Sequence, residues 1–323
     1  MTETGGPELT VDWVGVDGQP MRRLELHLTY VCGGRCVFCS EAHRMVRYRQ
    51  FPMTWGQVAT VLRKHARRGV TNLHLTGGEP TLHPHFVDTI RLAKKLGMKT
   101  SLGTLGGRLS HEAFAREAAP WLDEGLFSLH GPTAEVHNRA AGRKKSFARV
   151  IGAMELMPRL NRSFDVFVNT VVTRWNVDEL GQTVALADSL GAKLIVVSNL
   201  APEGRGEDRY AELAVPFAKL SRVLPLAAQE AKRAVVRFFG VPMCVLGDAR
   251  HLSNDLFWDP RVTVEWATMP QKVVLQDQYN WHPFRRRLWV DECAECELKG
   301  VCAGVFDKYA ELWSTKDLKP EFR

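Results

Sequence analysis

A short unit recurs along the first two thirds of the 323-residue chain: a helical pattern ends at a glycine, and an apolar, strand-like segment follows. The glycines at these junctions are Gly69, Gly97, Gly125 and Gly191. Glycine takes the left-handed conformation that ends many helices at low cost. The first three are 28 residues apart, and the interval before the fourth has room for two more such units. The sequence therefore predicts tandem βα units around a parallel sheet.

The repeats predict six strands and six helices. The expected strands cover 23–29, 72–76, 98–103, 126–130, 164–172 and 192–198, and the expected helices cover 55–68, 85–96, 110–118, 145–157, 177–190 and 212–232. Six βα units in tandem favour an α/β fold in which the sheet curves as a partial (β/α)6 TIM barrel. In such a fold the functional loops follow the carboxyl ends of the strands.

The βα rhythm stops near residue 240. Five of the nine tryptophans and three of the seven cysteines lie in the last 66 residues, where no such repeat is visible. The sequence therefore predicts a lead segment at 1–20, a barrel at 21–235 and a small C-terminal domain at 236–323. No low-complexity linker separates the last two, so we expect them to pack together.

Composition limits the classes of function. No stretch approaches the roughly 18 apolar residues of a membrane helix, and the N-terminus lacks a signal peptide, so we expect a cytoplasmic protein without a membrane segment. In that compartment, clustered cysteines indicate metal binding rather than disulfides. The formal charge is +7, and basic and aromatic residues alternate in Phe284–Trp289. No nucleic-acid-binding motif accompanies this run, which favours a solvated basic face.

Three cysteines, Cys32, Cys36 and Cys39, follow the first expected strand on a short loop that contains glycine. Three thiolates can ligate three irons of a [4Fe–4S] cluster and leave the fourth iron open to a small molecule. The alternative is a three-cysteine zinc site, for which His43 is the nearest further ligand.

The Cys-x3-Cys-x2-Cys spacing, with the aromatic Phe38 before the third cysteine, resembles the signature of the radical S-adenosylmethionine (SAM) superfamily. The resemblance extends over about residues 21–205. It implies a SAM-binding [4Fe–4S] cluster on these cysteines and an electron donor such as flavodoxin or ferredoxin. It also implies reductive cleavage of SAM to methionine and a 5′-deoxyadenosyl radical, which abstracts hydrogen from a substrate.

Further positions match the family's SAM pocket. The Gly-Gly-Glu-Pro turn after the second strand is similar to the motif that binds the methionine amino group. Ser128 on the fourth strand matches a serine that holds the carboxylate or the ribose. Ala141 stands at the usual arginine position, so Arg143 is the expected substitute. For His130, a structural role is favoured over a catalytic one. The resemblance implies SAM contacts from Phe38, Gly77, Gly78, Glu79, Pro80, Ser128, Arg143, Thr170, Asn199 and Pro202.

A second group, Cys293, Cys296 and Cys302, resembles the core of the SPASM and twitch auxiliary-cluster domains of the same superfamily. Together with Cys244 it offers four ligands for a closed second [4Fe–4S] cluster. Two alternatives stay open. The four cysteines could hold a structural zinc ion, or three could hold a cluster while Cys244 returns a hydrogen atom to the substrate.

These features predict a radical SAM enzyme that oxidises, cross-links or epimerises a ribosomal peptide or a small metabolite such as an aminosugar. The tryptophans and Arg285–Arg287 of the C-terminal domain are candidates for a peptide-docking surface. The competing hypothesis is a non-catalytic, cluster- or zinc-bearing binding protein on the same scaffold. Its mark would be the loss of a cluster cysteine or of Gly77–Glu79, and all of these are present.

Overall fold

The protein is described by a computed structural model that covers residues 14, 18–316 and 318–319. Its main sheet has nine strands in the order β7-β6-β5-β4-β3-β2-β1-β8-β9. Each of the first six strands pairs in parallel with the next one along the chain. This order is the one that tandem βα units produce.

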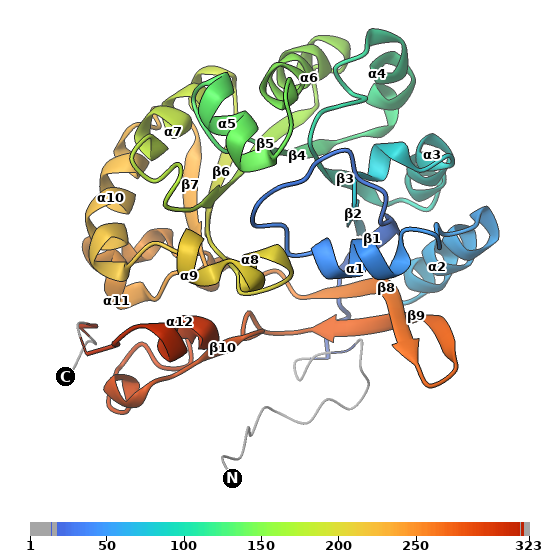
Figure 1. The fold of residues 1–323 in the computed structure, drawn as a ribbon. Helices are drawn as coiled ribbons and strands as arrows, with labels where there is room; N and C mark the ends of the chain where they lie inside the picture. The colour runs from blue at the N-terminus through green and yellow to red at the C-terminus, as the bar shows by residue number, and fades with distance from the viewer. Residues whose placement is uncertain (1–13, 15–17, 317, 320–323) are drawn as a thin grey trace.

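The predicted α/β architecture is confirmed, and all six expected strands and all six expected helices are present. The barrel strands are β1 (Arg23–Thr29), β2 (Asn72–Gly77), β3 (Lys99–Thr104), β4 (Glu124–Ser128), β5 (Asp165–Val172), β6 (Leu194–Asn199) and β7 (Val235–Phe239). The helices that alternate with them are α2 (Trp55–Arg67), α3 (Phe86–Lys95), α4 (Glu112–Ala118), α6 (Ser146–Leu160), α7 (Leu180–Ser189) and α10 (Phe217–Gln229). Figure 1 shows these helices along the outer side of the curved sheet.

Strand β5 shows how the sequence separates the two faces of the sheet. Val166, Val168 and Val172 are buried and belong to the main hydrophobic core, while Phe167, Asn169 and Val171 are partly exposed. Successive side chains of a strand point to opposite faces, so one face packs under the helices and the other faces the barrel interior. The interior face is therefore where polar side chains can serve a ligand.

Short helices that the repeat does not predict lie in the loops that follow barrel strands. They are α1 (Ala42–Tyr48) after β1, α5 (Ala134–Ala141) after β4, and α8 (Arg205–Asp208) and α9 (Tyr210–Leu213) after β6. All four are at the carboxyl ends of strands, where this class of fold places its functional loops.

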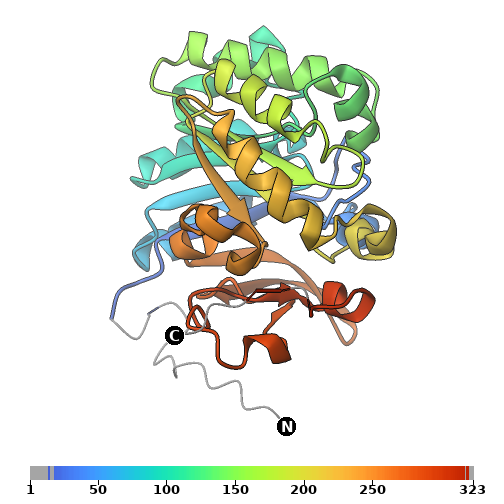
Figure 2. The same ribbon diagram turned by 90° about the vertical axis from the view of Figure 1, so that its left-hand side faces the viewer.

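The C-terminal region adds two strands to the barrel sheet. β8 (Arg261–Met269) pairs in parallel with β1, and β9 (Lys272–Asn280) pairs antiparallel with β8. The expected boundary at 235/236 falls at the start of β7, so the sheet continues through it, and the division into domains stays a prediction. Helix α11 (Met243–Leu246) follows β7. The last segments, β10 (Arg287–Leu288), β11 (Val305–Phe306) and α12 (Asp307–Leu312), lie beneath the barrel sheet in Figure 2.

Within the described ranges, the structure contains no helix with the length and apolar character needed to cross a membrane. The expected lead segment, 1–20, lies almost entirely outside those ranges.

Candidate functional site

The three cysteines of the first group lie on the loop between β1 and α1, and the end of α5 holds this loop. The amides of Arg35 and Val37 donate hydrogen bonds to the carbonyls of Ala141 and Ala140, at 3.1 and 3.0 Å. The last carbonyls of a helix have no partner within the helix, so they are free to accept these bonds. The loop is therefore fixed to the segment that follows β4.

Two arginines bind carbonyl groups of the same loop. The guanidinium of Arg143 donates to the carbonyl of Gly33 at 2.6 Å, and that of Arg205 donates to the carbonyl of Cys36 at 2.9 Å. A Cβ atom at Gly33 would lie 2.0 Å from Nη1 of Arg143, so a side chain there would displace the arginine. Both arginines thus hold the cysteine loop in shape.

The three thiols line one cavity of about 340 Å³, here called the cysteine cavity. That volume is within the range of small-molecule sites, roughly 300–1,000 Å³. Burial raises the pKa of Cys32 to about 11 and that of Cys36 to about 12, so a metal bound here must displace their protons. Nine of the residues predicted above as cluster ligands or SAM contacts line the cavity: Cys32, Cys36, Cys39, Phe38, Gly77, Gly78, Glu79, Ser128 and Asn199.

The Gly-Gly-Glu turn packs directly against the chain that leads into the cysteines. The amide of Gly78 donates to the carbonyl of Thr29 at 2.7 Å, and the amide of Glu79 donates to that of Val31 at 2.8 Å. A Cβ atom at Gly78 would lie 2.3 Å from the Val31 oxygen, so only glycine fits. The motif therefore brings the end of β2 and the start of the cysteine loop together at one wall of the cavity.

The carboxylate of Glu79 is fixed by donors on both sides. It accepts hydrogen bonds from the hydroxyls of Thr81 at 2.6 Å and Thr104 at 2.9 Å, and from the amide of Leu105 at 2.8 Å. Burial raises the pKa of Glu79, and the hydrogen bonds oppose that rise by stabilising the charged form. The side chain is thus oriented before any ligand binds.

Some expected SAM contacts lie outside the cavity lining. The hydroxyl of Thr170 is buried and donates to the carbonyl of Leu129 at 2.6 Å. Because side chains alternate along β5, its neighbours Asn169 and Val171 line the cavity instead. The residues of β5 that face the cavity are therefore the neighbours of Thr170, and not Thr170 itself. The residues outside the lining are Pro80, Arg143, Thr170 and Pro202.

Several polar side chains absent from the predicted set also line the cavity, among them Asn169 and Ser198. The hydroxyl of Ser198 on β6 donates to the Oδ1 atom of Asn169 on β5 at 2.7 Å. The alternation of buried and half-buried residues on β5 is the sequence signal that identifies Asn169.

Two histidines near the loop have structural partners. His130 borders the cavity, its Nδ1 accepts from the amide of Val171 at 3.2 Å, and burial lowers its pKa well below the ordinary value. His43, considered as a zinc ligand, pairs with Asp208 at 2.9 Å and does not line the cavity. The structural interpretation of His130 is therefore favoured.

The other four cysteines share a second, much smaller pocket of about 20 Å³, here called the second cysteine site. Cys244 comes from α11, Cys293 and Cys296 from the segment after β10, and Cys302 from the approach to β11. Burial, followed by the neighbouring cysteines, raises the pKa of Cys244 to about 12. The structure thus brings all four expected ligands together.

A buried ion pair supports the second cysteine site. Arg287 contacts both carboxylate oxygens of Asp255, at 2.8 and 3.0 Å, and donates to the carbonyl of Gly304 at 2.8 Å. The same carboxylate accepts the amide of Ala303 at 3.0 Å. These bonds fix the chain immediately after Cys302.

Arg287 is buried and therefore cannot belong to the basic docking surface that was expected at Arg285–Arg287. Its neighbours are also engaged within the protein, because Arg285 pairs with Glu203 at 2.9 Å and Arg286 pairs with Glu207 at 3.0 Å.

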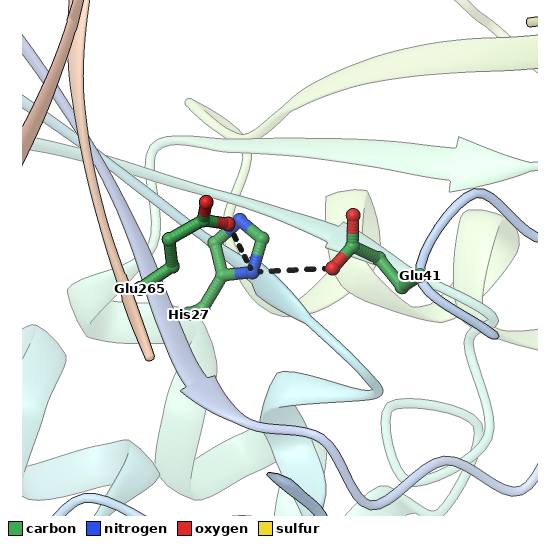
Figure 3. A group of neighbouring side chains, drawn as sticks. All are labelled: His27, Glu41 and Glu265. Carbon is green, nitrogen blue, oxygen red and sulfur yellow. Dashed lines mark ion pairs between the residues drawn. The ribbon is translucent and has the colours of Figure 1, made fainter. Parts of the chain in front are cut away.

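A charged cluster joins β1, α1 and β8 (Figure 3). Nδ1 of His27 lies 3.5 Å from Oε2 of Glu41 and 3.9 Å from Oε2 of Glu265. In the described part of the chain, this is the one set of three His, Cys, Asp or Glu residues whose ligand atoms all lie within 4.8 Å of one another. Arg44 contacts the other oxygens of both carboxylates, at 3.0 and 3.1 Å.

The charges of this cluster favour a protonated histidine over a metal ion. Burial favours the neutral ring, but the carboxylates of Glu25, Glu41 and Glu265 raise the pKa of His27. Arg44 already supplies one positive charge to two of these carboxylates. A proton on His27 supplies a second positive charge without the cost of desolvating a metal ion. The cluster is therefore explained as an ion-pair network that anchors α1 to β8.

Comparison with known proteins agrees with this geometry. Residues 26–187 match the model of the Radical SAM superfamily. The chain is 33% identical to the mycofactocin maturase MftC of Mycobacterium ulcerans, over 59% of this chain and 50% of that protein. It is 34% identical to the PqqA peptide cyclase of Ruegeria pomeroyi, over 61% of this chain and 51% of that protein. The chain thus spans about half the length of these relatives.

Among solved structures, SuiB of Streptococcus suis bound to S-adenosylmethionine superposes with a TM-score of 0.63 at 15% identity, covering 88% of this chain and 72% of that one. At this identity the likeness shows the fold. Because the family model covers half of the chain and the fold agrees, the chain belongs to the radical SAM superfamily, whose enzymes use a [4Fe–4S] cluster and SAM.

Proposed function

We propose that this enzyme is a maturase that oxidises a peptide by abstracting a hydrogen atom from it. The observation that carries the proposal is the cysteine cavity, in which three thiols and the Gly-Gly-Glu turn share a volume large enough for a cofactor. The names of the two relatives, a maturase and a peptide cyclase, support a peptide as the substrate class.

In this proposal Cys32, Cys36 and Cys39 hold a [4Fe–4S] cluster, and the residues around them hold SAM. Bound SAM supplies the 5′-deoxyadenosyl radical when one electron breaks its sulfonium carbon–sulfur bond. The chain contributes orientation: Arg205 and α5 fix the loop, and the donors around Glu79 fix that carboxylate at the cavity wall. The residues proposed to contact SAM are Phe38, Gly77, Gly78, Glu79, Ser128, Asn169, Ser198 and Asn199.

We also propose that the second cysteine site holds a closed auxiliary [4Fe–4S] cluster rather than zinc. A tetrahedral zinc ion with Zn–S bonds of about 2.3 Å draws its sulfurs to within about 3.8 Å of one another. In the described residues, no three of these cysteines bring their sulfurs within 4.8 Å of one another. Wider spacing suits a multi-iron cluster.

The position of Cys244 supports oxidation over epimerisation. An epimerase of the kind considered above needs a thiol beside the substrate radical to return a hydrogen atom. Cys244 lines the second cysteine site and not the cysteine cavity. In the part of the chain that the structure describes, the thiols lining the cavity are those of the three proposed ligands. We therefore favour loss of a further electron and a proton from the substrate radical, with bond formation or desaturation, and the proposed auxiliary cluster would accept that electron.

Anaerobic reconstitution tests the proposal. With iron, sulfide, SAM and dithionite, we expect about eight irons per chain, the content of two [4Fe–4S] clusters, and release of 5′-deoxyadenosine. The matched control is the Cys32→Ala/Cys36→Ala/Cys39→Ala variant, which should keep about four irons and release no 5′-deoxyadenosine. Full iron content without 5′-deoxyadenosine from the unmodified enzyme would overturn the proposal in favour of a binding protein.

A further inference from the structure

Several basic side chains on the cysteine loop and on the segments next to it do not line the cysteine cavity. None of them forms an ion pair with a residue in the described part of the chain. By contrast, Arg209, Arg285 and Arg286 each pair with a glutamate. The basic patch, as we call it, is made of residues on the cysteine loop, on the α5–α6 segment that holds this loop, and after β3, three of which line one pocket: Arg35, Arg108, Arg139, Arg143, Lys144, Lys145 and Arg149.

A pocket of about 200 Å³ lies within the basic patch and directly behind the cysteine loop. Gly33, the residue after Cys32, forms part of its wall. Glu79 and Leu105 line both this pocket and the cysteine cavity, so the two spaces adjoin at these residues. The basic residues that line the pocket, here called the arginine pocket, are Arg108, His111, Arg143 and Arg149.

The arginine pocket contains one acidic residue among the described residues that line it, and that residue is already engaged. Glu79 accepts hydrogen bonds from Thr104 and Leu105 and is buried between the two spaces. Arg143 and Arg108 are held in place through the carbonyls of Gly33 and Thr81. Fixed guanidinium groups without counter-charges form a site suited to a carboxylate from outside.

We propose that the basic patch is the docking surface for an acidic electron-transfer protein of the flavodoxin class, one carboxylate of which enters the arginine pocket. The inference rests on the proposed function, which consumes one electron for each SAM cleaved. The donor loses that electron, and SAM accepts it as its carbon–sulfur bond breaks to give methionine and the 5′-deoxyadenosyl radical. A donor on this surface lies against Gly33, one residue from a proposed cluster ligand.

The location favours an electron donor over an acidic peptide substrate. A substrate must reach the cysteine cavity, where the radical forms, whereas the residues of the basic patch do not line that cavity. An electron crosses the loop without any opening between the two spaces. The net charge of +7 adds long-range attraction for an acidic protein.

The test compares two double charge reversals. The patch variant is Lys144→Glu/Arg149→Glu, which leaves Arg143 and the cysteine loop unchanged. The control variant is Lys95→Glu/Lys232→Glu, the same change of charge at the amino-terminal ends of β3 and β7, on the opposite edge of the sheet. Binding of a bacterial flavodoxin is measured by fluorescence anisotropy at low salt, and 5′-deoxyadenosine is measured with reduced flavodoxin and, separately, with dithionite.

We expect the patch variant to bind flavodoxin about 10-fold or more weakly, and its flavodoxin-driven rate to fall by a similar factor. The control variant should keep both values, and both variants should keep the dithionite-driven rate. The difference in binding should shrink as salt is added, because salt screens exposed charges.

Equal flavodoxin binding by the two variants would overturn the proposal. A raised KM for peptide under dithionite, with flavodoxin binding unchanged, would assign the basic patch to the substrate and overturn it as well. Failure of the unmodified enzyme to release 5′-deoxyadenosine with dithionite would instead contradict the proposed function, while the binding measurement would still decide the docking surface.

Discussion

The two cysteine sites use the same side chain in opposite ways. In the first, three cysteines from one loop face a cavity of about 340 Å³, and in the second, four cysteines from three segments enclose about 20 Å³. Three ligands with open space can admit a small molecule, whereas four ligands without space cannot. Ligand number and free volume together therefore distinguish a site for chemistry from a site for electron transfer or structural support.

The supports of the two sites differ as well. The loop of the first site is held by single hydrogen bonds to carbonyls, from Arg143 and Arg205. The second site is held by the Asp255–Arg287 ion pair, whose side chains are almost fully buried. Removal of a supporting arginine should therefore lower the free energy of unfolding slightly at the first site and strongly at the second.

The largest expected effect separates the sites by activity. Cys36→Ala should reduce 5′-deoxyadenosine formation to the level without enzyme, because two thiolates cannot hold the cluster that binds SAM. Cys296→Ala should keep SAM cleavage measurable by chromatography under dithionite, since the second cysteine site does not line the cavity. Loss of cleavage in both variants would break the distinction between the sites.

The next effect concerns iron. Cys244→Ala should lower the iron content of the reconstituted enzyme from about eight to about four per chain, because a closed cluster needs its fourth ligand. Iron and zinc are measured together by mass spectrometry, with Cys32→Ala/Cys36→Ala/Cys39→Ala as the matched variant for the first site. Unchanged iron together with lost product formation would instead identify Cys244 as a hydrogen donor.

A smaller effect concerns stability. Arg287→Ala leaves Asp255 as a buried, unpaired carboxylate and should lower the free energy of unfolding by roughly 3–5 kcal/mol. Arg205→Ala, at the first site, removes a hydrogen bond to a carbonyl and should cost about 1–3 kcal/mol. Denaturant unfolding of the metal-free protein measures both. Equal losses would contradict the proposed difference in support.

The smallest effect depends on pH and concerns the charged cluster of His27, on the strand that leads into the first site. The folded-state pKa of His27 is above its ordinary value of 6.5, so its contribution to stability is complete below that value and is lost as pH rises through the higher folded value. We expect the unmodified protein to exceed His27→Gln in unfolding free energy by about 1 kcal/mol at pH 6, with a smaller difference at pH 9. A difference that does not change with pH would contradict a protonated His27.

The barrel could be predicted because its pattern is local, and the exceptions have physical reasons. The helix before β7 ends at Gln229 with no glycine after it, and the chain passes through Lys232 and Arg233 into the strand, so the repeat gave no sign of a seventh strand. The parallel pairing of β8 with β1 depends on residues far apart in sequence, which no periodic pattern reveals.

The sequence predicted the site residues well where a motif fixes the backbone. It predicted them less well where the direction of a side chain decides whether the residue lines the cavity. Glycine spacing located the turn at Gly77–Glu79, and cysteine spacing located both cysteine sites. Thr170 was chosen on the wrong face of β5, although counting by twos from Val168 would have excluded it. The direction of Arg143, toward Gly33 rather than into the cavity, depends on how α5 meets the cysteine loop.

The pairing of β8 with β1 also sets an order of events during folding. Arg261 and Glu25, which form an ion pair on these neighbouring strands, are 236 residues apart. Contacts that close so long a segment form late, because chain entropy opposes them until the intervening structure exists. The strand that leads into the first cysteines therefore gains its second neighbour only after the rest of the barrel has formed. We expect iron delivered earlier to meet a loop that is still exchanging between conformations, which makes cluster insertion a late step in the maturation of this enzyme.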